Sequence, residues 1–313
     1  MSLSRKEAAE AAPSPPAPAK PSERVRAKVR QLRKRFVFNR ELRLRLLSAA
    51  VLIPLVLLST WHGETTFLLV VLITGAVVLH EWFRMIGAGH LMGLKFLGWG
   101  GLALVAYVAQ TEPVFVATVA AVAVTVACTV AAWKDRTDIA ARWVAMGTLY
   151  AGLAIVALIA LRKGSDGFGA VVFVFLIAWA SDTMAFFVGR KLGGPKLWPK
   201  VSPSKTWSGA IGGFLAGVLL GAAVANALDV PLTGGTLAVA GFVAIAAQLG
   251  DLAESAAKRR FMIKDAGSII PGHGGVMDRV DGVIAASFVT AGLGTVMATE
   301  TPAAGLLLIM ALG

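Results

Sequence analysis

The sequence is poor in cysteine and in charged residues for its length of 313 residues. Charged residues make up 15% of the chain, against about a quarter in an average soluble domain, while 57% of the residues are hydrophobic. Because so little polar material cannot cover so much apolar surface in water, the composition excludes an ordinary soluble enzyme. A single cysteine, Cys128, excludes an internal disulfide and a cysteine-rich zinc or iron–sulfur site.

Acidic residues are also scarce, with 18 Asp and Glu against 30 Lys and Arg, which gives a formal net charge of +12. The basic residues alternate with long apolar stretches and not with the aromatic residues of a base-stacking groove, so we expect no nucleic-acid partner. An anionic membrane surface and anionic phosphate substrates fit this charge better.

Nine stretches are long and apolar enough to cross a bilayer, which takes roughly 20 residues of helix. They predict an all-α fold, a polytopic membrane helix bundle of about nine transmembrane helices with cytoplasmic catalytic loops. The apolar tail after Pro302 is too short to cross alone. The predicted spans are residues 44–61, 66–83, 93–110, 114–133, 143–161, 168–189, 207–228, 234–252 and 281–299.

Basic residues are distributed very unevenly around these spans. The amino-terminal region and the loops after the second, fourth, sixth and eighth spans share one side of the membrane. Of the 30 Lys and Arg residues, 28 fall on that side, and Arg162 and Lys163 fall on the other. Because cytoplasmic loops carry the excess of Lys and Arg, that side is predicted to be cytoplasmic and the protein to lie in the cell (inner) membrane.

The chain divides into three predicted regions. Residues 1–40 are rich in Ala, Pro, Ser and Lys without an apolar core segment, so we expect a disordered basic cytoplasmic tail. Residues 41–165 form an amino-terminal transmembrane region of about five spans. Residues 166–313 form a carboxy-terminal catalytic region of about four spans.

Carboxylates are costly inside a membrane, so those near span ends are functional candidates. Five aspartates gather in two segments, 181–213 and 248–282. The first segment adds lysines and hydroxyl groups suited to polyanionic oxygen, and the second adds further cations and glycines. Since Mg²⁺ prefers carboxylate oxygens and phosphate prefers cationic donors, these segments predict metal-assisted phosphoryl-type transfer. The five aspartates are Asp182, Asp251, Asp265, Asp278 and Asp281.

Simpler interpretations stay open for several of these residues. The Lys258–Arg260 run could be a positive-inside anchor, and Asp182 could be the structural partner of a lysine. His80 and Glu81, near the end of the second span, could form a cap or reach the site. The Gly209, Gly213, Gly217 and Gly221 series, at four-residue spacing, is predicted to serve helix packing.

The second segment resembles a known enzyme signature. The string S-x-x-K-R-x-x-x-x-K-D-x-G-x-x-x-P-G-H-G-G-x-x-D-R-x-D, from Ser255 to Asp281, is similar to that of the phosphatidate cytidylyltransferases, or CDP-diacylglycerol synthases. The QLGD, SDT and SPSKTW segments also resemble that family. One departure is Ser208, where family members often carry Glu.

The resemblance implies that CTP and phosphatidic acid are converted to CDP-diacylglycerol and pyrophosphate. It implies Mg²⁺ as the cofactor and leaves a second metal ion open. It implies catalytic roles for Asp251, Asp278, Asp281, Lys258 and His273. The metal ligands would come from Asp251, Asp278, Asp281 and Asp265. Substrate binding would fall to Ser202, Lys205, Thr206, Ser255, Arg259, Lys264, Gly274, Gly275 and Arg279.

Two other functions compete with this one. A CTP-dependent polyprenol or dolichol kinase would also use CTP at a membrane, but the PGHGG and DRVD strings favour the cytidylyltransferases. A carrier for an anionic solute tends to show paired halves, and the amino-terminal half has no counterpart of the 248–282 segment. Membrane lipids are expected partners, and the sequence leaves a homodimer open.

Overall fold

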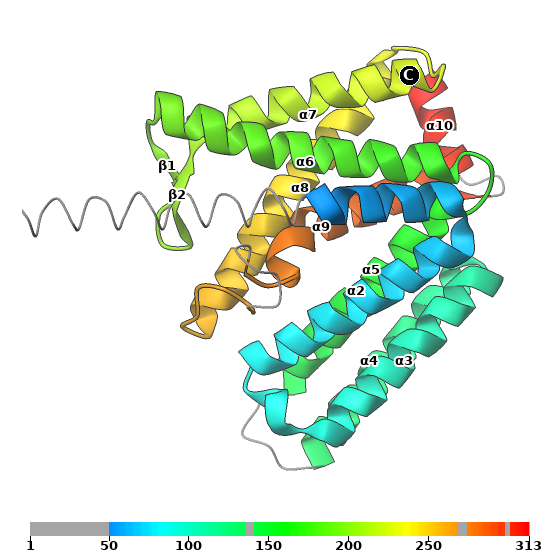
Figure 1. Ribbon diagram of the computed structural model, residues 1–313, viewed down its shortest axis with the longest axis vertical. Coiled ribbons are helices and arrows are strands. Elements are labelled where there is room, and N and C mark those ends of the chain that lie inside the picture. The colour runs from blue at the N-terminus through cyan, green and yellow to red at the C-terminus, as the bar shows by residue number, and fades with distance from the viewer. Residues whose placement is uncertain (1–49, 135–140, 268–273, 298–300, 313) are drawn as a thin grey trace, which may run out of the picture.

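The computed structural model describes residues 50–134, 141–267, 274–297 and 301–312, and the predicted tail lies outside them. The described chain is almost entirely helical (Figure 1). Eight helices are long and apolar enough to cross a membrane, which confirms the all-α polytopic prediction. They are α2 (Glu64–Met85), α3 (Met92–Thr111), α4 (Val114–Lys134), α5 (Ala141–Arg162), α6 (Gly167–Leu192), α7 (Trp207–Ala227), α8 (Gly234–Arg260) and α9 (Met277–Val296).

Two shorter apolar helices flank these eight. The first predicted span, 44–61, is described from residue 50 onward as the helix Ala50–His62. The tail after Thr301 forms α10 (Pro302–Leu312), which is too short to cross alone, as expected. Its Met310 is buried, and the Thr236 hydroxyl of α8 donates to the Met310 carbonyl at 3.0 Å. The tail therefore packs back onto the bundle.

The helix ends alternate as the predicted topology requires. Glu64, which begins α2, accepts hydrogen bonds from Gln110 near the end of α3 and from the Gly164 N–H after α5. Lys163 donates to the Glu112 carbonyl at 3.1 Å. The start of α2 and the ends of α3 and α5 therefore meet at one end of the bundle, as the predicted topology requires. The opposite end, where α8 ends and α9 begins, is called the motif end below.

Helix α5 lies at the centre of the bundle and packs against α2, α3, α4 and α9. Every residue from Ala154 to Arg162 is buried. The helices around it turn large apolar side chains outward, such as Phe115, which is 77% exposed, and Leu219, which is 71% exposed. Because lipid tails are as apolar as these side chains, such outer faces suit a bilayer.

Helices α6 and α7 pack closely along the glycine series of α7. A Cβ on Gly213 would lie 2.5 Å from the Ser181 carbonyl oxygen, and one on Gly221 would lie 2.8 Å from Ile177 Cδ1. Only glycine permits this approach, so the helix-packing prediction is confirmed.

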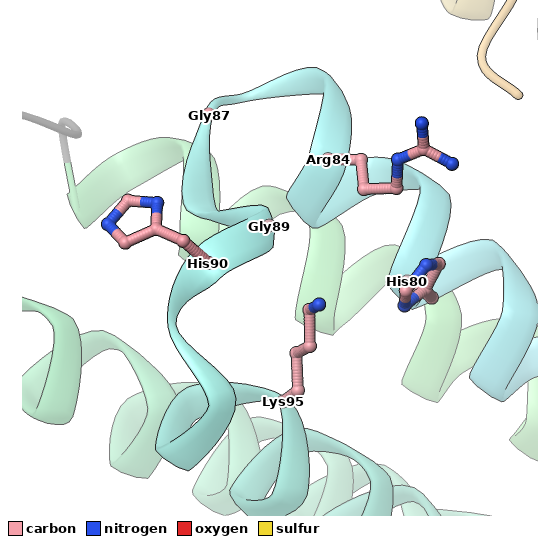
Figure 2. Close-up of a pocket in the computed structure, with 6 residues that line it drawn as sticks. All are labelled: His80, Arg84, Gly87, Gly89, His90 and Lys95. Atoms are coloured by element: carbon pink, nitrogen blue, oxygen red, sulfur yellow. The ribbon is translucent and has the colours of Figure 1, made fainter.

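Two connections at the motif end have structure of their own. Between α6 and α7, β1 (Lys196–Trp198) and β2 (Ser202–Thr206) form an antiparallel hairpin in which Lys196 lies opposite Thr206 (Figure 1). The sequence predicted a loop there. Between α2 and α3, Gly87 adopts a φ of +84°, which suits glycine and leads into the 3-10 turn η1 (Ala88–His90) (Figure 2).

Candidate functional site

Helix α8 extends eight residues beyond the predicted end of its span at 252. The charges that begin at Asp251 suggest a loop by hydropathy, but they continue the helix. At this spacing Asp251, Glu254 and Lys258 lie along one helix face. Ser255 and Arg259 are thus helical residues, and not loop residues as predicted.

Helices α8 and α9 cross closely beside these acids. A Cβ on Gly250 would lie 2.6 Å from the Asp281 carbonyl oxygen and 2.5 Å from Ala285 Cβ. A Cβ on Gly282 would lie 3.1 Å from the Ala247 carbonyl oxygen. The two glycines therefore let the acidic face of α8 approach the start of α9.

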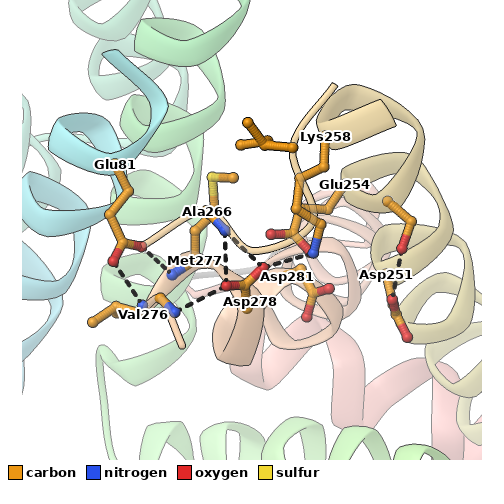
Figure 3. A network of polar contacts seen from close by, with 12 residues as sticks. Glu81, Asp251, Glu254, Lys258, Ala266, Val276, Met277, Asp278 and Asp281 are labelled. Carbon is orange, nitrogen blue, oxygen red and sulfur yellow. Dashed lines mark hydrogen bonds and ion pairs between the residues drawn. The ribbon is translucent and has the colours of Figure 1, made fainter. Parts of the chain in front are cut away.

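Three carboxylates meet at this crossing (Figure 3). Asp251, Glu254 and Asp281 each offer an oxygen atom, and these atoms lie within 4.8 Å of one another. We call them the acidic trio. Glu254 and Asp281 are buried, and Glu254 Oε1 has no hydrogen-bond partner among the described residues. A buried, unpartnered carboxylate oxygen is costly, and an all-carboxylate set suits a hard divalent cation, so the trio fits a metal ion.

Lys258 links the trio to Asp278. Its Nζ donates to Glu254 Oε2 at 3.0 Å and to Asp278 Oδ1 at 2.6 Å, and all three side chains are nearly enclosed. Buried charges need such pairing, because an isolated ion in a medium of low polarity loses its hydration. The ammonium therefore balances part of the negative charge of the cluster.

Asp278 also holds the chain on both sides of the 268–273 segment. It accepts hydrogen bonds from the Ala266 N–H at 3.0 Å and the Gly275 N–H at 2.9 Å. Gly274 has a φ of +85°, where side chains are strained. The N–H of Gly275, a predicted substrate-binding residue, thus donates to Asp278 in this structure. His273 lies outside the described residues.

Glu81 of α2 caps the start of α9. Its carboxylate accepts from the Val276 N–H at 3.0 Å and the Met277 N–H at 2.8 Å (Figure 3). The first N–H groups of a helix lack partners within the helix, and a negative charge there also favours the helix dipole. Of the two roles that the sequence left open for Glu81, the structure shows the cap.

The hairpin brings the first predicted segment to the trio. Lys205 Nζ on β2 lies 2.5 Å from Asp251 Oδ2, and Ser255 Oγ donates to Asp251 Oδ1 at 3.4 Å. Arg259 donates to the Val201 carbonyl at 3.3 Å. Asp182 of α6 lies within electrostatic range of Asp251 and Lys205. The two polar segments therefore form one site.

Other predicted site residues lie around this centre. Ser202 is buried on β2, and Thr206 caps α7 by accepting from the Gly209 N–H at 3.1 Å. Ser208, the departure from the family pattern, donates to the Gly193 carbonyl and so joins the start of α7 to the end of α6. Lys264, Asp265 and Arg279 are exposed. Asp265 and Asp278, two of the predicted metal ligands, are not part of the carboxylate group that could share a metal ion among the described residues.

Glu254 is the member of the acidic trio that the sequence did not predict. It follows Asp251 by three residues and precedes Lys258 by four, which is the spacing of neighbours on a helix surface. That signal depends on the helix continuing past residue 252, where the apolar run ends.

Comparison with known proteins identifies the family. A sequence profile described as "Cytidylyltransferase family" matches residues 43–297. This chain belongs to the cytidylyltransferase family. A Brucella abortus (biovar 1, strain 9-941) protein named phosphatidate cytidylyltransferase is 39% identical over 248 residues, which cover 79% of this chain and 90% of the relative. A Staphylococcus haemolyticus protein of the same name is 40% identical over 137 residues, which cover 44% of this chain and 52% of the relative.

The matched region contains the acidic trio, Lys258, the hairpin and the Glu81 cap. Membership of this family makes the chain a nucleotidyltransferase. Its apolar helices make it a multi-pass membrane protein.

Proposed function

We propose that this chain is a phosphatidate cytidylyltransferase, which converts CTP and phosphatidate to CDP-diacylglycerol and pyrophosphate in phospholipid biosynthesis. The family match and the names of the relatives support this activity. The observation that carries the proposal is the contact between Lys205 and Asp251, because it joins a cationic hairpin to an acidic cluster at one helix end. A triphosphate and a divalent metal need these two kinds of group together.

We propose Mg²⁺ as the metal ion, held by the acidic trio. The trio offers hard oxygen donors, and the unpartnered Oε1 of Glu254 is suited to a cation. When bound, the ion would neutralise charge on the triphosphate and polarise the phosphoryl group. Asp278 and Asp265 remain predicted ligands, although Asp278 is engaged by Lys258 and two N–H groups. A second metal ion would require such further ligands.

The reaction needs no protein nucleophile. An oxygen of the phosphatidate phosphate attacks the α-phosphorus of CTP and forms the new P–O bond. The bond from the α-phosphorus to the oxygen bridging to the β-phosphorus breaks, and pyrophosphate leaves with the bonding electrons. Because a phosphate monoester is largely dianionic near neutral pH, no strong base is needed, and His273 is assigned a hydrogen bond to substrate.

The cations position the substrates. Lys205 and Lys258 each contact a carboxylate of the trio, so a phosphate oxygen near the trio would lie within reach of both ammonium groups. Exposed cations at the rim would hold the charge of the triphosphate and of the leaving pyrophosphate. The other predicted substrate-binding residues are Ser202, Thr206, Ser255, Arg259, Lys264, Gly274, Gly275 and Arg279.

We propose that the motif end faces the cytoplasm in the inner membrane. The tails of phosphatidate stay in the bilayer, while CTP arrives from water, so the reacting groups belong at the membrane surface. The concentration of Lys and Arg on the predicted cytoplasmic side supports this orientation.

The test uses the purified full-length chain in detergent with phosphatidate, Mg²⁺ and CTP labelled in the cytosine ring. Ring label should enter the lipid in a 1:1 ratio with pyrophosphate released. A CTP-dependent kinase would instead phosphorylate a polyprenol and leave the ring label in water. Label that stays in the aqueous phase while pyrophosphate is absent would overturn the proposal.

A further inference from the structure

A polar pocket lies at the motif end, between the end of α2, the turn η1 and the start of α3 (Figure 2). Its volume is about 460 Å³. Four nitrogen-bearing side chains and two glycines line it, and no carboxylate is among them: His80, Arg84, Gly87, Gly89, His90 and Lys95. These groups take no part in the acidic trio or in the nucleotidyl transfer described above.

Lys95 is the most informative residue of this pocket. Its side chain extends from α3 toward the space between α2 and η1 (Figure 2), yet the residue is only 6% exposed. The one hydrogen bond of its ammonium group among the described residues is a long contact of 3.9 Å with the Met92 sulfur. Burying an ammonium group without an anionic partner is costly, so a bound anion would stabilise the pocket that the described residues form.

Among the described residues, no carboxylate forms an ion pair with Lys95. Glu81, next to His80 in the chain, turns its carboxylate to the start of α9. His80 Nδ1 is buried and has no hydrogen-bond partner among the described residues. Arg84 presents a guanidinium group whose fork geometry matches phosphate oxygens. These nitrogen-bearing side chains therefore line one cavity without an ion pair to a carboxylate among the described residues.

An apolar surface begins at the edge of the pocket. The His80 ring stacks on Trp99 with 6.0 Å between ring centroids, and Phe96 packs edge-on against Trp99 at 5.7 Å. Phe96 is 63% exposed and Met92 is 55% exposed. Both lie in the first turns of a membrane-spanning helix, where interfacial aromatic residues meet lipid.

We propose that this pocket binds the phosphate of an anionic phospholipid, whose acyl chain lies along Phe96 and Met92. The cations contact the phosphate, and the exposed apolar side chains contact the acyl chain, which a free phosphate lacks. The site is separate from the acidic trio, so the inference does not depend on the proposed nucleotidyl transfer.

The experiment measures lipid binding to the purified, delipidated full-length chain by native mass spectrometry in detergent. Dioleoyl phosphatidylglycerol is titrated against wild type, Lys95→Met and Lys191→Met. Lys95→Met removes the ammonium and keeps an unbranched side chain, and we expect binding to weaken by about tenfold or more. Lys191→Met removes the same charge from an exposed position on α6, and we expect no change. Lys95→Arg should retain most of the binding.

Three results would overturn the proposal. Lys95→Met could bind phosphatidylglycerol as tightly as wild type does, or zwitterionic dioleoyl phosphatidylcholine could bind equally well. Inorganic phosphate could bind the wild type and displace no lipid, which would assign the pocket to a free anion. Thermal unfolding of each variant shows whether a loss of binding reflects a loss of fold, and Arg84→Gln then provides a second variant with the same expected loss.

Discussion

Lys205 of the hairpin and Asp251 of α8 are 46 residues apart in the chain, yet their charged atoms lie 2.5 Å apart. Because this ion pair is partly exposed, it adds little to stability. Its significance is positional, since it sets a cation of the first polar segment beside the acidic trio of the second. Conversion of CTP requires cations and a metal site at one place, and this contact provides that arrangement.

The first prediction concerns the acidic trio. Glu254→Gln should lower kcat/KM by about 100-fold or more, because an amide oxygen is a poorer metal ligand and leaves the charge unbalanced. Turnover of labelled CTP at several Mg²⁺ concentrations measures the loss. Glu112→Gln, at the opposite end of the bundle, is the matched control and should retain activity. Wild-type turnover by Glu254→Gln would remove this residue from the metal site.

The second prediction concerns the buried pair of Lys258 and Asp278. Asp278→Asn leaves the ammonium with one carboxylate and should destabilise the protein by about 3 kcal/mol, as expected when one partner of a buried pair is removed. Thermal unfolding in detergent measures the change. The double variant Lys258→Met/Asp278→Asn should lose less stability than the two single variants added together. Additive losses would show that the two side chains act independently.

The third prediction concerns the cap that Glu81 provides. Glu81→Ala removes the acceptor of two helix N–H groups and should cost about 1 to 2 kcal/mol. Because α9 carries Asp281, loosening its start should also raise the Mg²⁺ concentration needed for half-maximal activity. Glu81→Gln keeps an acceptor oxygen and should recover part of both losses. A Mg²⁺ requirement that Glu81→Ala leaves unchanged would limit the role of Glu81 to stability.

Hydropathy and charge predicted much of the fold. Eight of the nine predicted spans match long apolar helices of the described chain, because a bilayer imposes length and apolarity on each helix. The four-residue glycine spacing of α7 also predicted its packing. The sequence did not predict the continuation of α8 to Arg260 or the β1–β2 hairpin. Hydropathy carries no signal for elements outside the apolar core, so the helix past residue 252 could be predicted only from the spacing of its charged residues.

The site was partly predictable for the same reason. Asp251 and Asp281 were identified because acids near span ends are costly, and the motif supplied the rest. Glu254 was missed with the end of α8. The meeting of Lys205 with Asp251, and that of Glu81 with the start of α9, depend on how distant helices pack, which local spacing does not contain.

The last prediction concerns the glycine crossing beneath the trio. A side chain on Gly250 would overlap the Asp281 carbonyl and Ala285, so Gly250→Ala should push α8 away from α9. We expect overpacking to cost roughly 1 to 3 kcal/mol and activity to fall further than this loss of stability alone would cause, because Asp251 and Asp281 would move apart. Gly292→Ala is the matched control, since a Cβ on Gly292 in α9 would meet nothing within 4 Å. Thermal unfolding and labelled-CTP turnover of both variants provide the comparison. Equal activity of the two variants would show that the spacing of the trio does not depend on close contact of the helices at Gly250.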